Sequence, residues 1–156
     1  MLLESLERMT ITTRQFGTID YAEEAVITFP EGLLGFERMH RFLLIDQPEI
    51  EPLRWLQSLD EPQIAFTVIE PELVFPDFKV HLTPSDREGL GLAAEVEPRV
   101  LVLVTVPKDP ADMTANLMGP LVLHPEKRIA RQLVLHDSTR GTRERLIPGA
   151  ASAVTA

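Results

Sequence analysis

The chain has 156 residues, carries 24 acidic side chains against 15 Lys and Arg, has a formal net charge of −9 and contains no cysteine. The lack of cysteine excludes disulfides, thiolate metal sites and thiol nucleophiles, and the acidic balance argues against direct nucleic-acid binding and favours a basic protein partner. No apolar run approaches the roughly 18 to 20 residues that span a bilayer, and Glu4 and Glu7 interrupt the N-terminal stretch, so we expect a cytoplasmic protein that does not contact a membrane.

The 13 prolines indicate the fold class, because they recur along the chain and a helix interior does not tolerate them. Between Pro30 and Pro125 they leave short segments rich in Val, Ile, Leu, Thr and Phe, which are typical of strands joined by turns. We therefore predict a mostly β fold, a small antiparallel β-barrel-like single domain with one or two short helices. The domain is expected at residues 10–146, after an N-terminal extension at 1–9 and before a disordered C-terminal tail at 147–156.

The first strand is expected at residues 10–16, where Gly17 ends it. A second strand at 19–21 and 25–29 contains an acidic turn, and it predicts a hairpin with the first strand. The block that follows places a proline and two glycines among large apolar residues, so the backbone must bend while apolar groups stay near the core. It predicts a tight, ordered loop whose structural residues are Phe29, Pro30, Gly32 and Gly35.

The middle of the chain predicts three more strands, at residues 41–46, 53–59 and 63–70. A short helix is expected at 84–92, because Thr83 or Ser85 can cap its start and Gly91 can end it. A β-branched run then predicts a central strand, and alternation on both sides of Pro125 predicts a final hairpin. These elements are expected at residues 99–106, 117–124 and 129–136.

The acidic segment between residues 70 and 78 is the first candidate interaction site. Phe75 and Phe78 flank a Pro-Asp pair, and if both rings point the same way they form an apolar anchor with an acidic rim, as protein-binding patches do. The alternative is that both rings close one end of the barrel. The candidate contacts are Glu70, Glu72, Phe75, Pro76, Asp77 and Phe78.

A second candidate segment contains two carboxylates and an amide that suggest a cation site in outline. A capped turn is the simpler interpretation, because Asp109 or Asp112 can accept hydrogen bonds from exposed backbone amides. We therefore assign no metal here. The candidate partner contacts on this segment are Asp109, Asp112, Met113 and Asn116.

Enzyme signatures are missing from the sequence, which has no phosphate-binding loop, no H-E-x-x-H and no G-x-S-x-G. The four histidines are scattered singly, so the spacing does not favour a zinc site. An open alternative is a small β-barrel enzyme or ligand-binding protein with a pocket in the barrel mouth, where His124 or His136 would act.

Short sequence blocks occur in a characteristic order from about Thr10 to Arg143. They include the loop block, the Trp-Leu-Gln-Ser run that begins at Trp55, and the region around Pro120. Together they resemble the flagellar assembly factor FliW family, although that family usually has proline where this chain has Leu34, and many relatives have tyrosine at Phe78 and Arg140. The blocks are residues 27–37, 55–58, 60–62, 65–66, 105–107, 113–117 and 132–135.

The resemblance implies a protein with no catalysis and no cofactor that acts in bacterial flagellum assembly. It implies that the chain is monomeric alone, binds newly made flagellin, and also binds the translational repressor CsrA. Flagellin would release CsrA to stop flagellin translation, and export of flagellin would reverse this. Capture of flagellin is expected to rely on an apolar groove that draws on Leu33, Phe36, Phe75 or Phe78.

Overall fold

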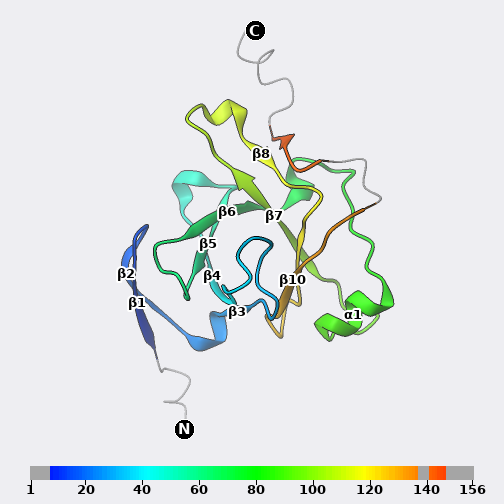
Figure 1. Ribbon diagram of the computed structural model, residues 1–156, viewed down its shortest axis with the longest axis horizontal. Helices are drawn as coiled ribbons and strands as arrows, with labels where there is room; N and C mark the ends of the chain where they lie inside the picture. Colours follow the sequence, from blue (N-terminus) through cyan, green and yellow to red (C-terminus); the bar gives the residue numbers. More distant parts are fainter. Residues whose placement is uncertain (1–7, 137–140, 147–156) are drawn as a thin grey trace.

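The computed structural model describes residues 8–136 and 141–146, which form a mostly β fold with one α-helix, α1, at Pro84–Leu90 (Figure 1). Most of the predicted N-terminal extension and the whole predicted C-terminal tail lie outside the described residues. Short 3-10 helices occur at Glu23–Ala25, Pro48–Ile50, Pro71–Leu73 and Pro110–Asp112. The strands are β1 Met9–Thr13, β2 Gly17–Tyr21, β3 Ile27–Thr28, β4 Arg41–Ile45, β5 Arg54–Ser58, β6 Ala65–Ile69, β7 Arg99–Thr105, β8 Thr114–Ala115, β9 Leu121–Leu123, β10 Ala130–Gln132 and β11 Glu144–Arg145.

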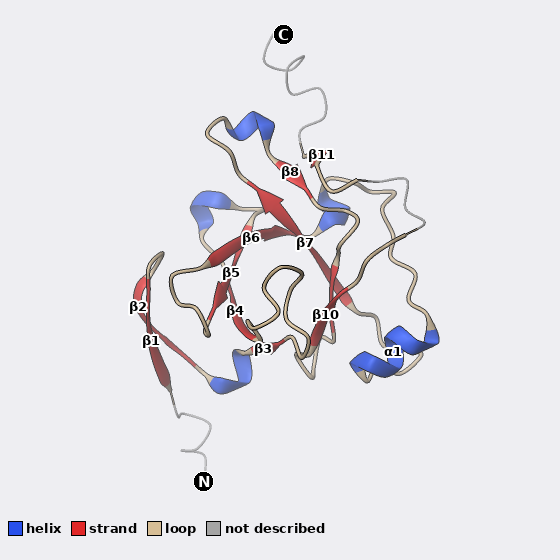
Figure 2. Ribbon diagram, in the orientation of Figure 1, coloured by secondary structure: helices blue, strands red, loops and turns tan. Residues whose placement is uncertain are grey.

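The main sheet is antiparallel and has the strand order β10-β9-β7-β6-β5-β4-β3, with β8 paired to β7 and β11 paired to β8 (Figure 2). The predicted mostly β class is confirmed. A closed barrel is not formed among the described residues, because the two edge strands share no ladder. They meet at one isolated parallel bridge between Thr28 and Ile129, where the Thr28 amide donates to the Arg128 carbonyl at 2.9 Å.

The curled main sheet encloses one apolar cluster, the inner cluster, to which each of the seven strands from β10 to β3 contributes. Strands β1 and β2 form a separate hairpin, which packs through Ile11 and Ile19 on the outer face of β4. Other segments cover the remaining outer faces, so side chains of both faces of the sheet are buried. The strand residues of the inner cluster are Ile27, Phe42, Leu56, Val68, Leu101, Leu121, Leu123 and Ala130.

Local sequence signals set both ends of helix α1. The Thr83 hydroxyl accepts from the Asp86 amide and the Asp86 carboxylate accepts from the Thr83 amide, both at 3.0 Å, which makes a capping box. Gly91 ends the helix with φ +67°, and Leu90 packs on the outer face of β9. The predicted helix is confirmed, although it ends two residues earlier than expected.

The predicted final hairpin is shorter in the structure. Its ladder holds three residue pairs, Ala130 to Leu123 through Gln132 to Leu121. Beyond it the chain stays in contact by single backbone bonds, from the Leu133 amide to Pro120 O at 2.9 Å and from the Leu135 amide to Met118 O at 2.8 Å. The second predicted strand is also divided, because a 3-10 turn at Glu23–Ala25 sends β2 and β3 into different sheets.

Candidate functional site

The loop between β3 and β4 lies within the ring of strands in Figure 1. Its two ends are joined by the Phe29 amide, which donates to the His40 carbonyl at 2.7 Å. Inside the loop the Phe36 amide donates to Leu33 O at 2.7 Å. Its tip is held from the opposite edge of the sheet, since the Leu34 amide donates to Gln132 Oε1 at 2.8 Å. The predicted tight, ordered loop is confirmed.

Two glycines make this turn possible. Gly32 and Gly35 have φ values of +70° and +85°, a region that favours glycine. The Gly35 amide donates to Glu37 Oε2 at 3.0 Å, and this hydrogen bond is the main cause that lowers the pKa of Glu37. The Glu37 carboxylate thus stabilises the exposed side of the loop through a charge-assisted hydrogen bond.

The side chains of the loop point in two directions. Phe29, Leu33 and Met39 are buried in the inner cluster, and they fill one end of the curled sheet. Leu34 and Phe36 are 57% and 41% exposed. The sequence expectation that Leu33 offers a contact surface is wrong for this conformation, because its side chain is 1% exposed. Leu34 was missed, although its place between two glycines at a loop tip was a usable signal.

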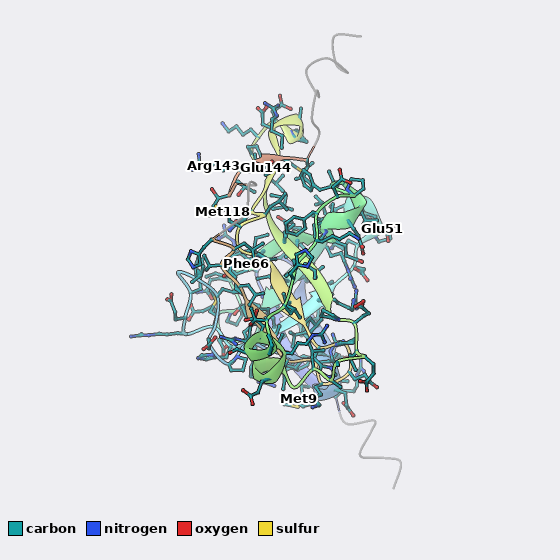
Figure 3. The ribbon with its side chains drawn as sticks, turned by 90° about the vertical axis from the view of Figure 1, so that its right-hand side faces the viewer. Met9, Glu51, Phe66, Met118, Arg143 and Glu144 are labelled. Carbon is teal, nitrogen blue, oxygen red and sulfur yellow. The ribbon has the colours of Figure 1, made fainter. Side chains whose placement is uncertain are left out.

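The exposed loop side chains belong to a larger apolar face. The Phe36 ring meets the Phe66 ring edge-on with centroids 5.1 Å apart. Gln132, which holds Leu34, also donates to Gly119 O at 3.0 Å, and so brings the loop beside the 118–119 turn. Figure 3 shows Phe66 and Met118 on the same side of the molecule. We call this surface the loop face, and its members are Leu34, Phe36, Phe66 and Met118.

The predicted aromatic anchor on the acidic segment is not exposed. Phe75 and Phe78 are 6% and 9% exposed and pack against Val102 and Val104 of β7. The short helix at Pro71–Leu73 turns the chain back over the outer face of β6 and β7, and the rings pack on that face. Neither the exposed anchor nor the alternative, in which the rings close one end of the barrel, describes their position. Leu73 instead is 59% exposed.

The acidic members of this segment lie at the surface. Glu72, Pro76 and Asp77 are exposed, whereas Glu70 lies within 4 Å of two arginines. A groove of about 520 Å³ runs between this segment, α1 and the start of β7. Three acidic and three basic side chains line it together with apolar groups. The lining residues are Glu70, Pro71, Glu72, Pro76, Phe78, Lys79, Val80, Leu82, Arg87, Glu97, Pro98, Arg99 and Val100.

The second candidate segment is a capped turn. Asp109 Oδ1 accepts from the Ala111 amide at 3.0 Å, and Asp112 pairs with Arg145 at 3.0 Å. Asn116 Oδ1 accepts from the Met118 and Gly119 amides at 3.1 and 3.0 Å, so it shapes the turn that carries part of the loop face. No group of three or more His, Asp or Glu able to hold a metal ion occurs among the described residues.

The histidines named for the alternative function do not line the groove. His124 is buried, and its Nδ1 accepts from the Glu126 and Lys127 amides, both at 3.1 Å. This contact shapes the turn between β9 and β10. His136 is exposed on the segment that follows β10. In residues 8–136 and 141–146 no helix has the length and apolar character needed to cross a membrane.

Two residues from the sequence blocks that carry the resemblance, Trp55 and Pro120, support the scaffold. The Trp55 Nε1–H donates to Gln47 Oε1 at 2.9 Å, and the indole meets the Phe16 ring edge-on at 5.7 Å. Pro120 is buried and its carbonyl accepts from the segment after β10. Together the described residues define an antiparallel β protein with exposed apolar side chains on the loop face and on the acidic segment.

Comparison with known proteins identifies the family. The model of the FliW family, described as "FliW protein", matches residues 10–146. The chain is 48% identical to the flagellar assembly factor FliW of Bdellovibrio bacteriovorus, over 87% of this chain and 78% of that one. It is 38% identical to the FliW of Leptospira interrogans, over 90% and 95% of the two chains. The chain belongs to the FliW family.

The solved structures agree with this identification. A crystal structure of the flagellar assembly factor FliW superposes with a TM-score of 0.83 at 33% sequence identity. The match covers 90% of this chain and 98% of the other, so the described fold is that of the whole related protein.

Proposed function

We propose that this chain is a cytoplasmic, non-enzymatic flagellar assembly factor that binds flagellin and antagonises CsrA, and so couples flagellin synthesis to export. The names of its relatives support the role in flagellar assembly. One structural observation carries the binding part of the proposal. Leu34 and Phe36 are exposed on a loop whose backbone is fixed at both ends and at its tip.

The loop face suits an amphipathic helix. Exposed apolar side chains on a rigid loop are already in their binding geometry, so little conformational entropy is lost when a partner docks. The terminal segments of flagellin are amphipathic helices that stay unpaired before export, and such helices lay their apolar side on a hydrophobic surface. Flagellin is therefore the partner that we assign to the loop face.

Isothermal titration with the host's own flagellin tests this assignment. Phe36→Ala removes the aromatic group at the centre of the loop face and is expected to weaken binding by about 10-fold or more, as the loss of an interface anchor does. Val106→Ala is the matched control, because Val106 is 47% exposed and lies just after β7, outside the loop face. Equal affinities of the Phe36 variant and the control would exclude the loop face as the flagellin site.

The acidic segment is the surface that we assign to CsrA. RNA-binding repressors of this kind are basic, and an acidic partner gains encounter rate and selectivity from that complementarity. Glu72 and Asp77 are exposed and flank the exposed Leu73, which supplies an apolar contact. The assignment differs from the sequence hypothesis in its apolar anchor, since Phe75 and Phe78 are buried.

Charge reversal tests the CsrA assignment. Glu72→Lys with Asp77→Lys is expected to weaken CsrA binding and to flatten its dependence on salt. Glu24→Lys with Glu126→Lys changes the net charge equally on other elements and is expected to have a smaller effect. The assignment fails if both double variants lose the same affinity.

Competition tests the switch itself. Flagellin is expected to displace CsrA from the wild-type protein, and the Phe36→Ala variant should require more flagellin to do so. Binding of flagellin alone would reduce the function to that of a chaperone. Binding of neither protein would favour the alternative of a ligand-binding β protein.

A further inference from the structure

A cluster of charged side chains lies at the end of the main sheet opposite the loop face. Residues two positions apart on a strand face the same side, so each charged residue that lies two positions from an inner-cluster residue also faces inward. Arg54 precedes Leu56, Glu70 follows Val68, and Arg99 precedes Leu101 in this way. In Figure 3, Phe66 of the loop face lies on one side and Glu51, which precedes β5, lies on the other.

The two carboxylates of this cluster, Asp46 and Glu70, contact the arginines at different distances. Arg54 forms a close two-point pair with Asp46, with Nε 2.6 Å from Oδ1 and Nη2 3.3 Å from Oδ2. Glu70 lies between the other guanidinium groups at longer range, 3.7 Å from Arg54 Nη1 and 3.9 Å from Arg99 Nη2. Neither distance is that of a hydrogen bond, so among the described residues most N–H donors of Arg99 have no acceptor.

Arg128 adds a third cation to this end. It lies in the turn between β9 and β10 with φ +54°, and its Nε donates to the Ala25 carbonyl at 3.2 Å. Within residues 8–136 and 141–146 it has no acidic partner inside 4 Å. Burial lowers the pKa of Arg128, and the positive charges of Arg99 and Arg54 lower it further, so the three groups repel one another.

This end of the sheet thus holds three arginines against two carboxylates, Asp46 and Glu70, in a chain with a net charge of −9. Like charges held together at partly buried positions are unfavourable unless an anion relieves their repulsion. Arginine presents planar N–H donors that match the oxygens of phosphate and carboxylate groups. Glu70 and Arg99 also line the groove beside α1, which gives a small anion access from solvent.

We propose that Arg54, Arg99 and Arg128 form a binding site for one small oxyanion at this end of the sheet. Arg99 and Arg128 supply the free donors, and Arg54 stays anchored by Asp46. The shared ligand chemistry is an oxygen-rich monoanion or dianion, presented either by free phosphate or by a carboxylate. This inference stands on the arginine cluster and does not depend on the proposed partners.

Thermal denaturation in phosphate tests the site. The melting temperature of the wild-type protein in about 50 mM sodium phosphate is compared with that in sodium chloride of equal ionic strength. A specific site is expected to raise Tm by roughly 3 °C or more. Arg128→Gln and Arg99→Gln should each lose most of this increase, whereas Arg145→Gln, which removes a paired arginine on β11, should keep it. The Arg145 control separates specific binding from the general stabilisation that phosphate gives.

A variant that should fold and a second anion complete the test. Arg99→Gln removes only a 3.9 Å ion pair, so the variant should fold even if the Arg128 turn does not tolerate change. A second titration with sodium acetate identifies the source of the oxyanion, because a carboxylate site responds to acetate and a phosphate site does not. Equal shifts in wild type and in all three variants, or no shift with either anion, would overturn the proposal.

Discussion

Replacing Gly32 by alanine is expected to destabilise the protein more than the same change at Gly35. Both glycines have positive φ, so alanine at either position costs about 1 to 2 kcal/mol of backbone strain. At Gly35 nothing lies within 4 Å of the added Cβ, and this strain is the whole cost. At Gly32 the added Cβ would lie 2.6 Å from the carbonyl oxygen of Glu37 and 2.7 Å from its Cα, so the loop must open.

The difference between the two variants measures this close approach. Backbone atoms cannot move aside as the end of a flexible side chain can, and overpacking of this kind costs about 1 to 3 kcal/mol more. For a chain of this size each kcal/mol lowers Tm by about 2 to 4 °C. The Gly32→Ala variant is therefore expected to melt roughly 2 to 12 °C below the Gly35→Ala variant.

Urea denaturation followed by circular dichroism gives the two free energies of unfolding, and a flagellin titration reads out the loop face. The Gly32→Ala variant should lose affinity as well as stability, because Leu34 and Phe36 shift when the loop opens. Equal unfolding midpoints for the two variants would refute the reasoning, since both share the strain and differ only in the contact with Glu37.

Three further predictions concern single side chains. Thr83→Ala removes the capping box of α1 and is expected to lower the free energy of unfolding by about 1 kcal/mol in urea denaturation, and no change would show that the cap is not needed. His124→Leu leaves the Glu126 and Lys127 amides without their acceptor, at a cost of about 1 to 3 kcal/mol for each. His124→Asn should restore part of the stability in urea denaturation, and no restoration would indicate that His124 only fills space. Glu37 stabilises the fold at a pH above the ordinary carboxyl pKa of 4.5, and this contribution disappears as the pH falls through its lowered pKa. Glu37→Gln should therefore flatten the dependence of the free energy of unfolding on pH in that acidic range. An unchanged slope would contradict the role of the Gly35 hydrogen bond.

Local rules explain which parts of the fold could be predicted from the sequence. Prolines excluded long helices, and the Thr83 cap and Gly91 marked both ends of α1, because these signals act within a few residues. The lengths of β9 and β10 could not be predicted in this way. Residues after Gln132 alternate like a strand, but their partners are the carbonyls of a turn, and that pairing depends on tertiary contacts.

The candidate site could likewise be predicted only in part, because its side-chain orientations depend on tertiary contacts. Phe36 and Leu33 were both predicted as contacts, but only Phe36 is exposed, and Leu34, which was not a candidate, is exposed as well. An irregular loop has no period that assigns side chains to a face. Phe75 and Phe78 are buried because the chain folds back over β6 and β7. The arginine cluster needed the register of three strands, which a single sequence does not specify.

The bridge between Thr28 and Ile129 also bears on solubility. An exposed sheet edge is a template for pairing with other chains, and proteins avoid this by keeping edge strands short or covered. Here the edge strands β3, β10 and β11 of the main sheet have only two or three residues each, and the bridge joins Thr28 of β3 to Ile129, the residue before β10. The main sheet therefore offers little unpaired backbone to another strand, which protects a chain rich in β structure from edge-to-edge aggregation while its side-chain surfaces stay open to partners.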